Sequence, residues 1–423
     1  MFVKFFRHFI AGFNVVSILN LVFNKRKSKS RRIDMAFPSG RHFLQIPGPT
    51  NVPDEVLRSM DMPTIDHRGP DFSRLLLGIL DKLRPVFGTD RVVIFPSSGT
   101  GAWEAALVNT LSPGDRVLMS ETGHFSSLWH EMATRLGLEV DLIPGNWRHG
   151  ADPKEIEARL KEDKDHLIKA VAVVHNETST GVVSRIPQVR QALDNAGHPA
   201  LLLVDTISSL GSLPYDHDGW GVDVTISCSQ KGLMLPPGLG FNAVSPKAMD
   251  ISNRGGGMPR SFWDWGDVVK ANERGFTHYT PATNLLYGLD KSLDLLLEEG
   301  LDNVFARHRR YGEATRHAVR AWGLGILCEN QEEYSQVLTA VMMPEGHDAD
   351  ALRKVILENF DMSLGAGLSK VAGKVFRIGH LGAFNDVTLA GTLAGVEMGL
   401  QMAGVPHREG GVQAAMRYLA ETA

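Results

Sequence analysis

The stretch Val222-Asp223-Val224-Thr225-Ile226-Ser227-Cys228-Ser229-Gln230-Lys231-Gly232 decides our interpretation of the fold, because an apolar run of β-strand character leads to a lysine. A second apolar run, Leu-Leu-Leu-Val at 201–204, ends at Asp205. Both runs are typical of strands buried on both faces of a parallel sheet. A lysine on a loop is ordinarily a solvated charge. The position of Asp205 upstream favours a different interpretation, in which Lys231 and Asp205 form a working pair at one edge of the sheet.

An amine and a carboxylate at the same sheet edge meet two needs of pyridoxal 5'-phosphate. The aldehyde of this cofactor forms a Schiff base with a lysine, and its pyridine nitrogen requires an acidic partner. The chain from 91 to 205 alternates strand-like and helix-like segments, which predicts a mostly parallel sheet with helices on both faces and ligands at the carboxyl ends of its strands. Ser98, Thr178, Asp205 and Lys231 all fall at such ends.

A turn of small residues, Pro96-Ser97-Ser98-Gly99-Thr100-Gly101, joins a strand expected at 91–95 to a helix-forming run that begins at Ala102. Small residues let the backbone approach an anion, and the hydroxyl and N–H groups at a helix start donate to it. Such turns also occur as ordinary packing geometry, and this one lacks the Gly-Lys-Ser/Thr of a nucleotide P-loop. We interpret it as a candidate phosphate site.

The composition describes a globular chain of 423 residues that is 43% hydrophobic, long enough for a large core and for two domains. Two cysteines, Cys228 and Cys328, cannot make a disulfide framework, and no paired Cys/His metal spacing occurs. Beyond residue 34, 36 basic residues against 47 acidic ones leave a net charge of −11, which does not favour nucleic acid. We therefore expect a cytoplasmic protein whose core has neither a nucleic-acid nor a membrane partner.

Residues 1–34 form a separate extension. Its apolar part, 9–23, is shorter than the about 20 residues of a bilayer-spanning helix, and a basic cluster follows at 25–32. Three alternatives stay open: an anchor on a membrane surface, an organelle-targeting sequence, or a natural start at Met35 with the extension not made. We favour the start at Met35, because the organised chain begins directly after it.

Four regions are expected along the chain: the extension 1–34, an arm 35–52, a large cofactor-binding domain 53–300 and a small C-terminal domain 301–423. Asn51 is expected to cap the first helix, and leucines at helical spacing predict a long helix before the boundary near Gly300. In the small domain, Arg377 alternates with apolar neighbours on a strand. A buried arginine is costly unless paired, so Arg377 meets either an internal acid or the carboxylate of a substrate.

Seven segments, in order, resemble the class V aminotransferases of the aspartate-aminotransferase fold, and the resemblance covers nearly everything from Ile46 to the C-terminus. They are Pro47-Gly48-Pro49, Ser98 to Glu104, His175 to Gly181, Leu203-Val204-Asp205, Ser229-Gln230-Lys231, Tyr279-Thr280-Pro281 and Lys374 to His380. The resemblance implies an α/β fold of the type I pyridoxal-phosphate class, with a large mostly parallel sheet domain and a smaller C-terminal α/β domain.

The resemblance also implies a role for each matching residue. Lys231 would hold the cofactor and carry the reacting proton, Asp205 would keep the pyridine nitrogen protonated, and Arg377 would bind the α-carboxylate of the substrate as a fork. The cofactor phosphate would be held by Ser98, Gly99, Thr100 and Gln230, joined by Thr280 from the second subunit of a dimer and by Tyr279. The cofactor ring would lie between Phe125 and Ile207, with Thr178 donating to its phenolic oxygen. Further substrate contacts would come from Gly48, His67 and Arg68.

These implied roles predict a homodimer with shared active sites that transfers the amino group of L-serine to glyoxylate, giving hydroxypyruvate and glycine. In serine-using relatives the position of His67 can be tyrosine, so the contact of His67 with the serine hydroxyl departs from the pattern. Alanine and asparagine are alternative donors. A C–S lyase or cysteine desulfurase shares the fold, but a desulfurase requires a nucleophilic cysteine on a mobile loop, whereas Cys328 is expected at the end of a buried strand. A cofactor-free scaffold is the remaining alternative, against which Lys231 and Asp205 argue.

Overall fold

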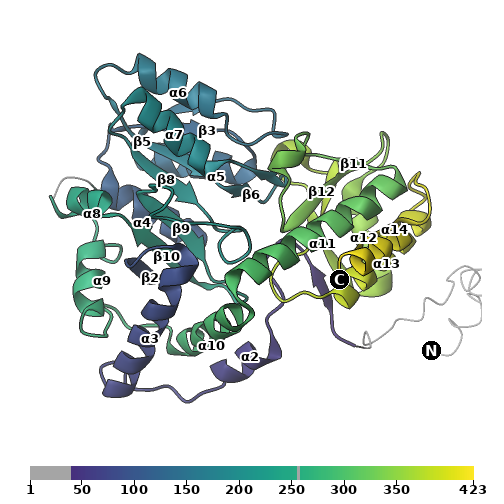
Figure 1. Cartoon of the computed structure of the whole chain (residues 1–423), viewed down its shortest axis with the longest axis horizontal. Coiled ribbons are helices and arrows are strands. Elements are labelled where there is room, and N and C mark those ends of the chain that lie inside the picture. Colours follow the sequence, from purple (N-terminus) through teal and green to yellow (C-terminus); the bar gives the residue numbers. More distant parts are fainter. Residues whose placement is uncertain (1–39, 255–257) are drawn as a thin grey trace, which may run out of the picture. The chain divides into compact units, whose positions relative to one another are not determined.

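The computed structural model describes residues 40–254 and 258–423, so the predictions for residues 1–34 lie outside it. Residues 43–423 form one unit built on two main sheets (Figure 1). Among the described residues, no helix combines the length and the apolar character that crossing a membrane requires.

The larger sheet has seven strands, and five of them pair in parallel. Strand β10 runs antiparallel to both of its neighbours, β2 and β9. The mostly parallel sheet expected from the alternating pattern is therefore confirmed. In spatial order the strands are β2 (Val92–Ser97), β10 (Gly238–Val244), β9 (Val224–Cys228), β8 (Leu201–Asp205), β5 (Ile168–Val174), β3 (Arg116–Ser120) and β4 (Glu139–Ile143).

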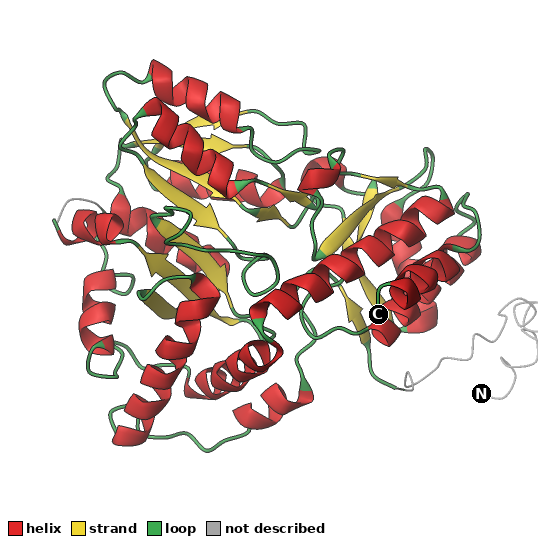
Figure 2. Ribbon diagram, viewed as in Figure 1, coloured by secondary structure: helices red, strands yellow, loops and turns green. Residues whose placement is uncertain are grey.

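Helices cover both faces of this sheet (Figure 2), because successive side chains of each buried strand point to opposite faces. On β8, Leu202 and Val204 pack into one apolar cluster while Leu201 and Leu203 pack into the other. The first cluster includes side chains of α3 (Pro70–Phe87), α6 (Pro153–Glu162), α7 (Ile186–Ala196) and α10 (Thr283–Glu299). The second includes side chains of α4 (Gly99–Thr110), α5 (His124–Arg135), α8 (Pro246–Asn253) and α9 (Trp265–Asn272).

The smaller sheet has five strands and is formed mainly by the C-terminal part of the chain. Its strands, in spatial order, are β1 (Phe43–Gln45), β13 (Met362–Ala366), β14 (Val375–Gly379), β12 (Leu338–Met342) and β11 (Gly325–Ile326). The helices that share its apolar cluster are α11 (Leu301–Trp322), α12 (Ala349–Phe360), α13 (Asp386–Met402) and α14 (Gly411–Glu421). The change of sheet follows Gly300, which separates α10 from α11, while the four-region division stays a prediction.

Strand β1 joins the N-terminal arm to this smaller sheet. Residues 43–45 pair in parallel with 362–364 of β13, so part of the expected arm is a strand of the C-terminal sheet. The expected cap at Asn51 was wrong: helix α2 (Asp54–Met60) begins after Pro53 without a capping side chain. Asn51 instead donates to the carbonyl of Leu44, which ties the two ends of the intervening segment together.

Candidate active site

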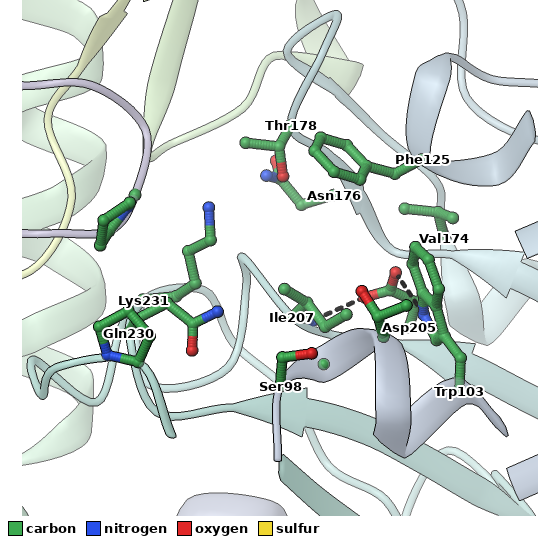
Figure 3. A pocket seen from close by; sticks show the side chains of 15 residues that line it. Ser98, Trp103, Phe125, Val174, Asn176, Thr178, Asp205, Ile207, Gln230 and Lys231 are labelled. Carbon is green, nitrogen blue, oxygen red and sulfur yellow. Dashed lines mark hydrogen bonds between the residues drawn. The ribbon is translucent and has the colours of Figure 1, made fainter. Parts of the chain in front are cut away.

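A cavity lies at the carboxyl ends of β8 and β9 and the start of α4 (Figure 3). Ten of the predicted site residues line it: Gly48, Ser98, Gly99, Thr100, Phe125, Thr178, Asp205, Ile207, Gln230 and Lys231. Figure 3 shows Lys231 and Asp205 on opposite sides of the cavity, with Phe125 and Ile207 between them at different heights. The sheet's strand ends, the start of α4 and the N-terminal arm therefore bring together residues that are up to 183 positions apart in the chain.

Lys231 follows β9 and extends its amine into the cavity, although only 9% of the residue is exposed. Its Nζ donates to the carbonyl of Pro47 over 2.6 Å. Burial disfavours the charged amine and lowers the pKa of Lys231 to about 8. The structure therefore holds a buried amine that loses its proton more readily than an ordinary lysine does.

The segment 47–50 lies directly against this lysine. Gly48 has a φ of +98°, and a Cβ at that position would come within 2.3 Å of the Lys231 amine, so a side chain there is excluded on both grounds. Thr50 adds two bonds, from its N–H to the carbonyl of Gln230 at 3.1 Å and from its hydroxyl to that of Lys231 at 3.1 Å. The backbone around the lysine is thus fixed by the N-terminal arm.

Asp205 ends β8 inside the cavity and is 3% exposed. Its Oδ1 accepts from the N–H of Ile207 at 2.6 Å and its Oδ2 from the indole N–H of Trp103 at 3.0 Å. Burial raises the pKa of Asp205 to about 7, while these two bonds act against the rise. The sequence interpretation missed Trp103. The signal was present, because Trp103 lies four residues after Gly99 on α4 and so shares its helix face.

The turn at the start of α4 has the features of an anion site. Ser98 occupies the N-cap without a bond from its side chain to the first turn of the helix. Gln230, opposite, has a buried side-chain oxygen with no hydrogen-bond partner among the described residues. A Cβ at Gly99 would lie 2.4 Å from the Ile207 side chain, so glycine lets the backbone approach the cavity. Free N–H groups at a helix start favour negative charge here.

Thr178 and Asn176 lie beside Phe125 on the far side of the cavity (Figure 3). Ser208 holds both of them: it accepts from the Thr178 hydroxyl at 2.7 Å and from the Asn176 amide at 2.8 Å, and it donates to the Asn176 carbonyl at 2.9 Å. The sequence interpretation did not single out Asn176 or Ser208, because a serine in a turn 30 residues away gives no local signal of this contact.

Arg377 is buried on β14 and does not line the cavity, but it is bonded to a residue that does. Its Nη1 donates to the Thr178 carbonyl at 2.6 Å and its Nε to the Ala366 carbonyl at 2.7 Å. Burial lowers its pKa to about 10, and the nearby carboxylate of Glu177 opposes that decrease. The guanidinium is therefore held against the cavity-lining residue Thr178, with its charge retained at neutral pH.

Four predicted residues lie away from the cavity of their own chain. Arg68 lines a separate hollow with Thr277 and His278, and Thr280 is exposed. The ring of Tyr279 packs against Phe95, and its hydroxyl donates to the carbonyl of Ile94. His67 is half-buried, and its Nε2 has no hydrogen-bond partner among the described residues. The roles assigned to His67, Arg68, Tyr279 and Thr280 stay predictions, which require a second subunit.

Comparison with known proteins identifies the family. Residues 42–381 match the family Aminotransferase class-V. The chain belongs to the class V aminotransferases. It is 51% identical over 389 residues to the serine–glyoxylate aminotransferase of Methylorubrum extorquens, covering 90% of this chain and 97% of that relative. It is 47% identical over 380 residues to the L-aspartate–glyoxylate aminotransferase of Paracoccus denitrificans, covering 89% and 96%.

Solved structures of this aminotransferase family show the same fold. The ureidoglycine–glyoxylate aminotransferase of Bacillus subtilis superposes with a TM-score of 0.85 at 29% identity, covering 91% of this chain and 99% of that structure. The expected aspartate-aminotransferase-like fold is therefore confirmed. The family resemblance drawn from seven short segments is confirmed by the same comparisons.

Proposed function

We propose that this class V aminotransferase moves the amino group of L-serine to glyoxylate, with pyridoxal 5'-phosphate bound in the cavity of Lys231 and Asp205. The observation that carries the proposal is the placement of this amine and this carboxylate on opposite sides of one cavity (Figure 3). The serine–glyoxylate aminotransferase of Methylorubrum extorquens, at 51% identity, supports the choice of substrates.

The residues present fit this cofactor. The α4 turn offers N–H and hydroxyl donors to a phosphate group, and Gly99 leaves the space that a side chain would fill. The amide oxygen of Gln230 has no partner among the described residues, so the amide is free to turn its NH2 group, which donates, toward the phosphate. Phe125 and Ile207 offer apolar faces to a flat ring. Asp205 offers a carboxylate to a pyridine nitrogen. When bound, pyridoxal phosphate supplies the electron sink that allows a substrate Cα–H bond to break.

The residues of the chain supply the remaining chemistry. Lys231 moves the proton at the substrate Cα, a task for which its lowered pKa of about 8 suits it near neutral pH. Arg377 binds the α-carboxylate and orients the substrate, because a guanidinium offers a planar pair of donors. Asp205 holds a proton on the pyridine nitrogen. Phe125 and Ile207 exclude water from the reacting atoms.

We further propose that two copies of the chain complete each site. His67, Arg68 and Thr280 do not line the cavity of their own chain, although the family resemblance gives them site roles. Arg68 and Thr280 are exposed, as residues that reach a neighbouring subunit must be before assembly. A homodimer explains both facts. Sedimentation of the purified protein should give twice the chain mass.

A panel of amino donors tests the substrate assignment. Each L-amino acid, including serine, alanine, asparagine and aspartate, is added to the cofactor-loaded protein, and the visible absorbance is followed for conversion to the aminated cofactor. Glyoxylate, pyruvate and oxaloacetate are then added to reverse it. Serine with glyoxylate should react fastest. Faster conversion by aspartate would instead place the chain with its Paracoccus denitrificans relative.

The desulfurase alternative has no support in the structure. Cys328 lies just beyond β11, is buried, and its thiol contacts the carbonyl of Asn330. Burial raises the pKa of Cys328 to about 12, which keeps the thiol protonated and weakly nucleophilic. Cysteine added to the loaded protein should therefore release no sulfide. Cys228, the last residue of β9, is likewise buried, with its pKa raised to about 12.

A further inference from the structure

A buried carboxylate without a place in the proposed chemistry lies beside the cavity. Glu177, in β6 (Asn176–Glu177), is fully buried and does not line the cavity. Its Oε1 accepts from the N–H of Phe125 at 3.3 Å, and its Oε2 from the N–H of Ser126 at 3.0 Å. Oε1 also accepts from the N–H of Ser179 at 3.0 Å and from its hydroxyl at 2.7 Å. A buried carboxylate is costly unless it is hydrogen-bonded, and these four bonds give both of its oxygens partners.

On one side, Glu177 is hydrogen-bonded to the start of α5, the helix that carries Phe125 into the cavity. Glu177 and Ser179 take up N–H groups that have no partner within the helix, since Ser179 accepts from the N–H of His124 at 2.9 Å. The sequence makes room for them at Gly123, where a Cβ would lie 2.4 Å from the Glu177 side chain and 2.4 Å from the Ser179 hydroxyl. The φ of Gly123 is 170°, so close approach, and not backbone conformation, requires glycine there.

The second side of the contact is the turn that holds Arg377. Thr178 lies between Glu177 and Ser179, and its carbonyl accepts from Arg377 Nη1 at 2.6 Å. The negative charge of Glu177 also raises the pKa of Arg377 against the effect of burial. Glu177 therefore fixes the position of the Thr178 carbonyl and stabilises the charge of the guanidinium that is bonded to it.

We propose that Glu177 is a positioning residue for transamination, because its carboxylate joins the start of α5, which carries Phe125, to the turn that holds Arg377. The proposal rests on the proposed function, since it gives Phe125 the cofactor ring and Arg377 the substrate carboxylate. Glu177 itself touches neither the cofactor ring nor the substrate carboxylate. It acts through the two residues that do.

The variant E177Q tests the proposal because it keeps the size of the side chain and removes its charge. An amide also turns one of two acceptor oxygens into a donor, which faces backbone N–H groups. We expect the dissociation constant of pyridoxal phosphate, measured by quenching of tryptophan fluorescence, to rise about ten-fold. We expect the KM for L-serine to rise by about the same factor, with a smaller change in kcat.

A pH series separates positioning from simple structural support. The probe is 3-hydroxypropionate, which has the carboxylate and hydroxyl of serine without the amine, tested as a competitive inhibitor of the loaded enzyme. Its inhibition constant should rise at alkaline pH as Arg377 loses its proton. Arg353 and Lys231 are the other charged groups that act on or respond to Arg377, and both are the same in wild type and in E177Q. Without the Glu177 charge this rise should begin at lower pH, because that charge supports the protonated guanidinium.

The matched control is E333Q. Glu333 is also a buried carboxylate that accepts from a backbone N–H, that of Gly150 at 2.9 Å, and it does not line the cavity. E333Q should lower the melting temperature without changing the cofactor affinity, the KM for L-serine or the pH at which the inhibition constant of 3-hydroxypropionate rises. Equal effects of E177Q and E333Q on these three quantities would overturn the proposal, as would wild-type values in E177Q.

A second variant covers the case in which E177Q does not fold. G123A is allowed by the backbone and adds one methyl group against Glu177 and Ser179, so it should weaken cofactor binding in the same direction. Unchanged cofactor affinity in folded G123A would count against the proposal. If wild-type protein does not react with serine, the same series is run with whichever donor reacts. All amino acids have the carboxylate that Arg377 is proposed to bind. A failure of the serine assignment therefore leaves the test of Glu177 intact.

Discussion

The indole N–H of Trp103 donates to Oδ2 of Asp205 over 3.0 Å, at one side of the candidate cofactor site, which both residues line (Figure 3). The indole is held in turn by Trp129, whose ring stacks on it with centroids 5.8 Å apart and an angle of 11° between the planes. Because the N–H of Ile207 binds the other oxygen, the carboxylate of Asp205 has one defined orientation. A carboxylate oriented in advance loses little freedom when a ring nitrogen binds it.

We predict that W103F weakens cofactor binding. The variant removes one donor from a buried carboxylate, which is worth about 1.5–3 kcal/mol, or about a ten-fold or greater rise in the dissociation constant of pyridoxal phosphate. Titration with absorbance detection measures it. The matched control is W129F, which alters the same ring stack, but the Trp129 indole N–H has no partner among the described residues. Equal loss in both variants would show that packing, and not the hydrogen bond, governs the affinity.

Asp205 also predicts how the stability of the cofactor-free protein depends on pH. Its pKa rises from 3.8 to about 7 in the folded chain because of burial, so between these values the folded state holds a proton that the unfolded state has lost. The free energy of unfolding therefore falls as pH rises through this window. D205N lacks this titration. Its stability relative to wild type should increase from pH 4 to pH 7, by on the order of 4 kcal/mol at most. Urea denaturation at several pH values measures the difference, and a constant difference would contradict the assigned pKa.

The sequence predicted the strand ends well because local pattern determines them. Leu201–Asp205 is apolar until its last residue, and the structure buries all five residues. Lys231 and Ser98 then follow from the rule that parallel strands present their carboxyl ends at one edge. The contacts of Trp103 with Asp205 and of Ser208 with Thr178 were not predictable, because they join residues 102 and 30 positions apart whose side-chain directions depend on tertiary packing.

The arm was predicted less well for the same reason. Its Pro-Gly-Pro sequence indicates a turn, but nothing local shows that 43–45 adds a strand to a sheet whose next strand begins at Met362. The expected cap at Asn51 failed because its amide has a tertiary partner, the carbonyl of Leu44. Polar side chains near a helix start predict a cap only when no better partner lies close in space.

Lys231 predicts a separation of activity from stability. K231M should abolish turnover, since no other amine lines the cavity among the described residues. The cofactor-free variant should be at least as stable as wild type at pH 7, because burial lowers the pKa of Lys231 from 10.5 to about 8 and so makes its charge costly. The wild-type protein should regain stability relative to K231M between about pH 8 and 10.5, where its folded state releases the proton first. Thermal melting of both proteins across this range measures the effect, and residual turnover in K231M would reject the role of Lys231.

Arg377 predicts a change in substrate affinity that a lysine cannot restore. R377K keeps a positive charge but not the planar pair of donors, and its shorter head group cannot reach the carbonyls of Thr178 and Ala366 with the same geometry. The proposed pair of charge-assisted hydrogen bonds from Arg377 to the substrate carboxylate is worth about 3 kcal/mol. Its loss should raise KM about 100-fold for serine and for glyoxylate alike. The control is the affinity for pyridoxal phosphate, which should remain within about two-fold because Arg377 does not line the cavity. Steady-state kinetics with each substrate varied in turn decides the matter: an effect on serine alone would assign Arg377 to the donor side chain and leave the carboxylate to another residue.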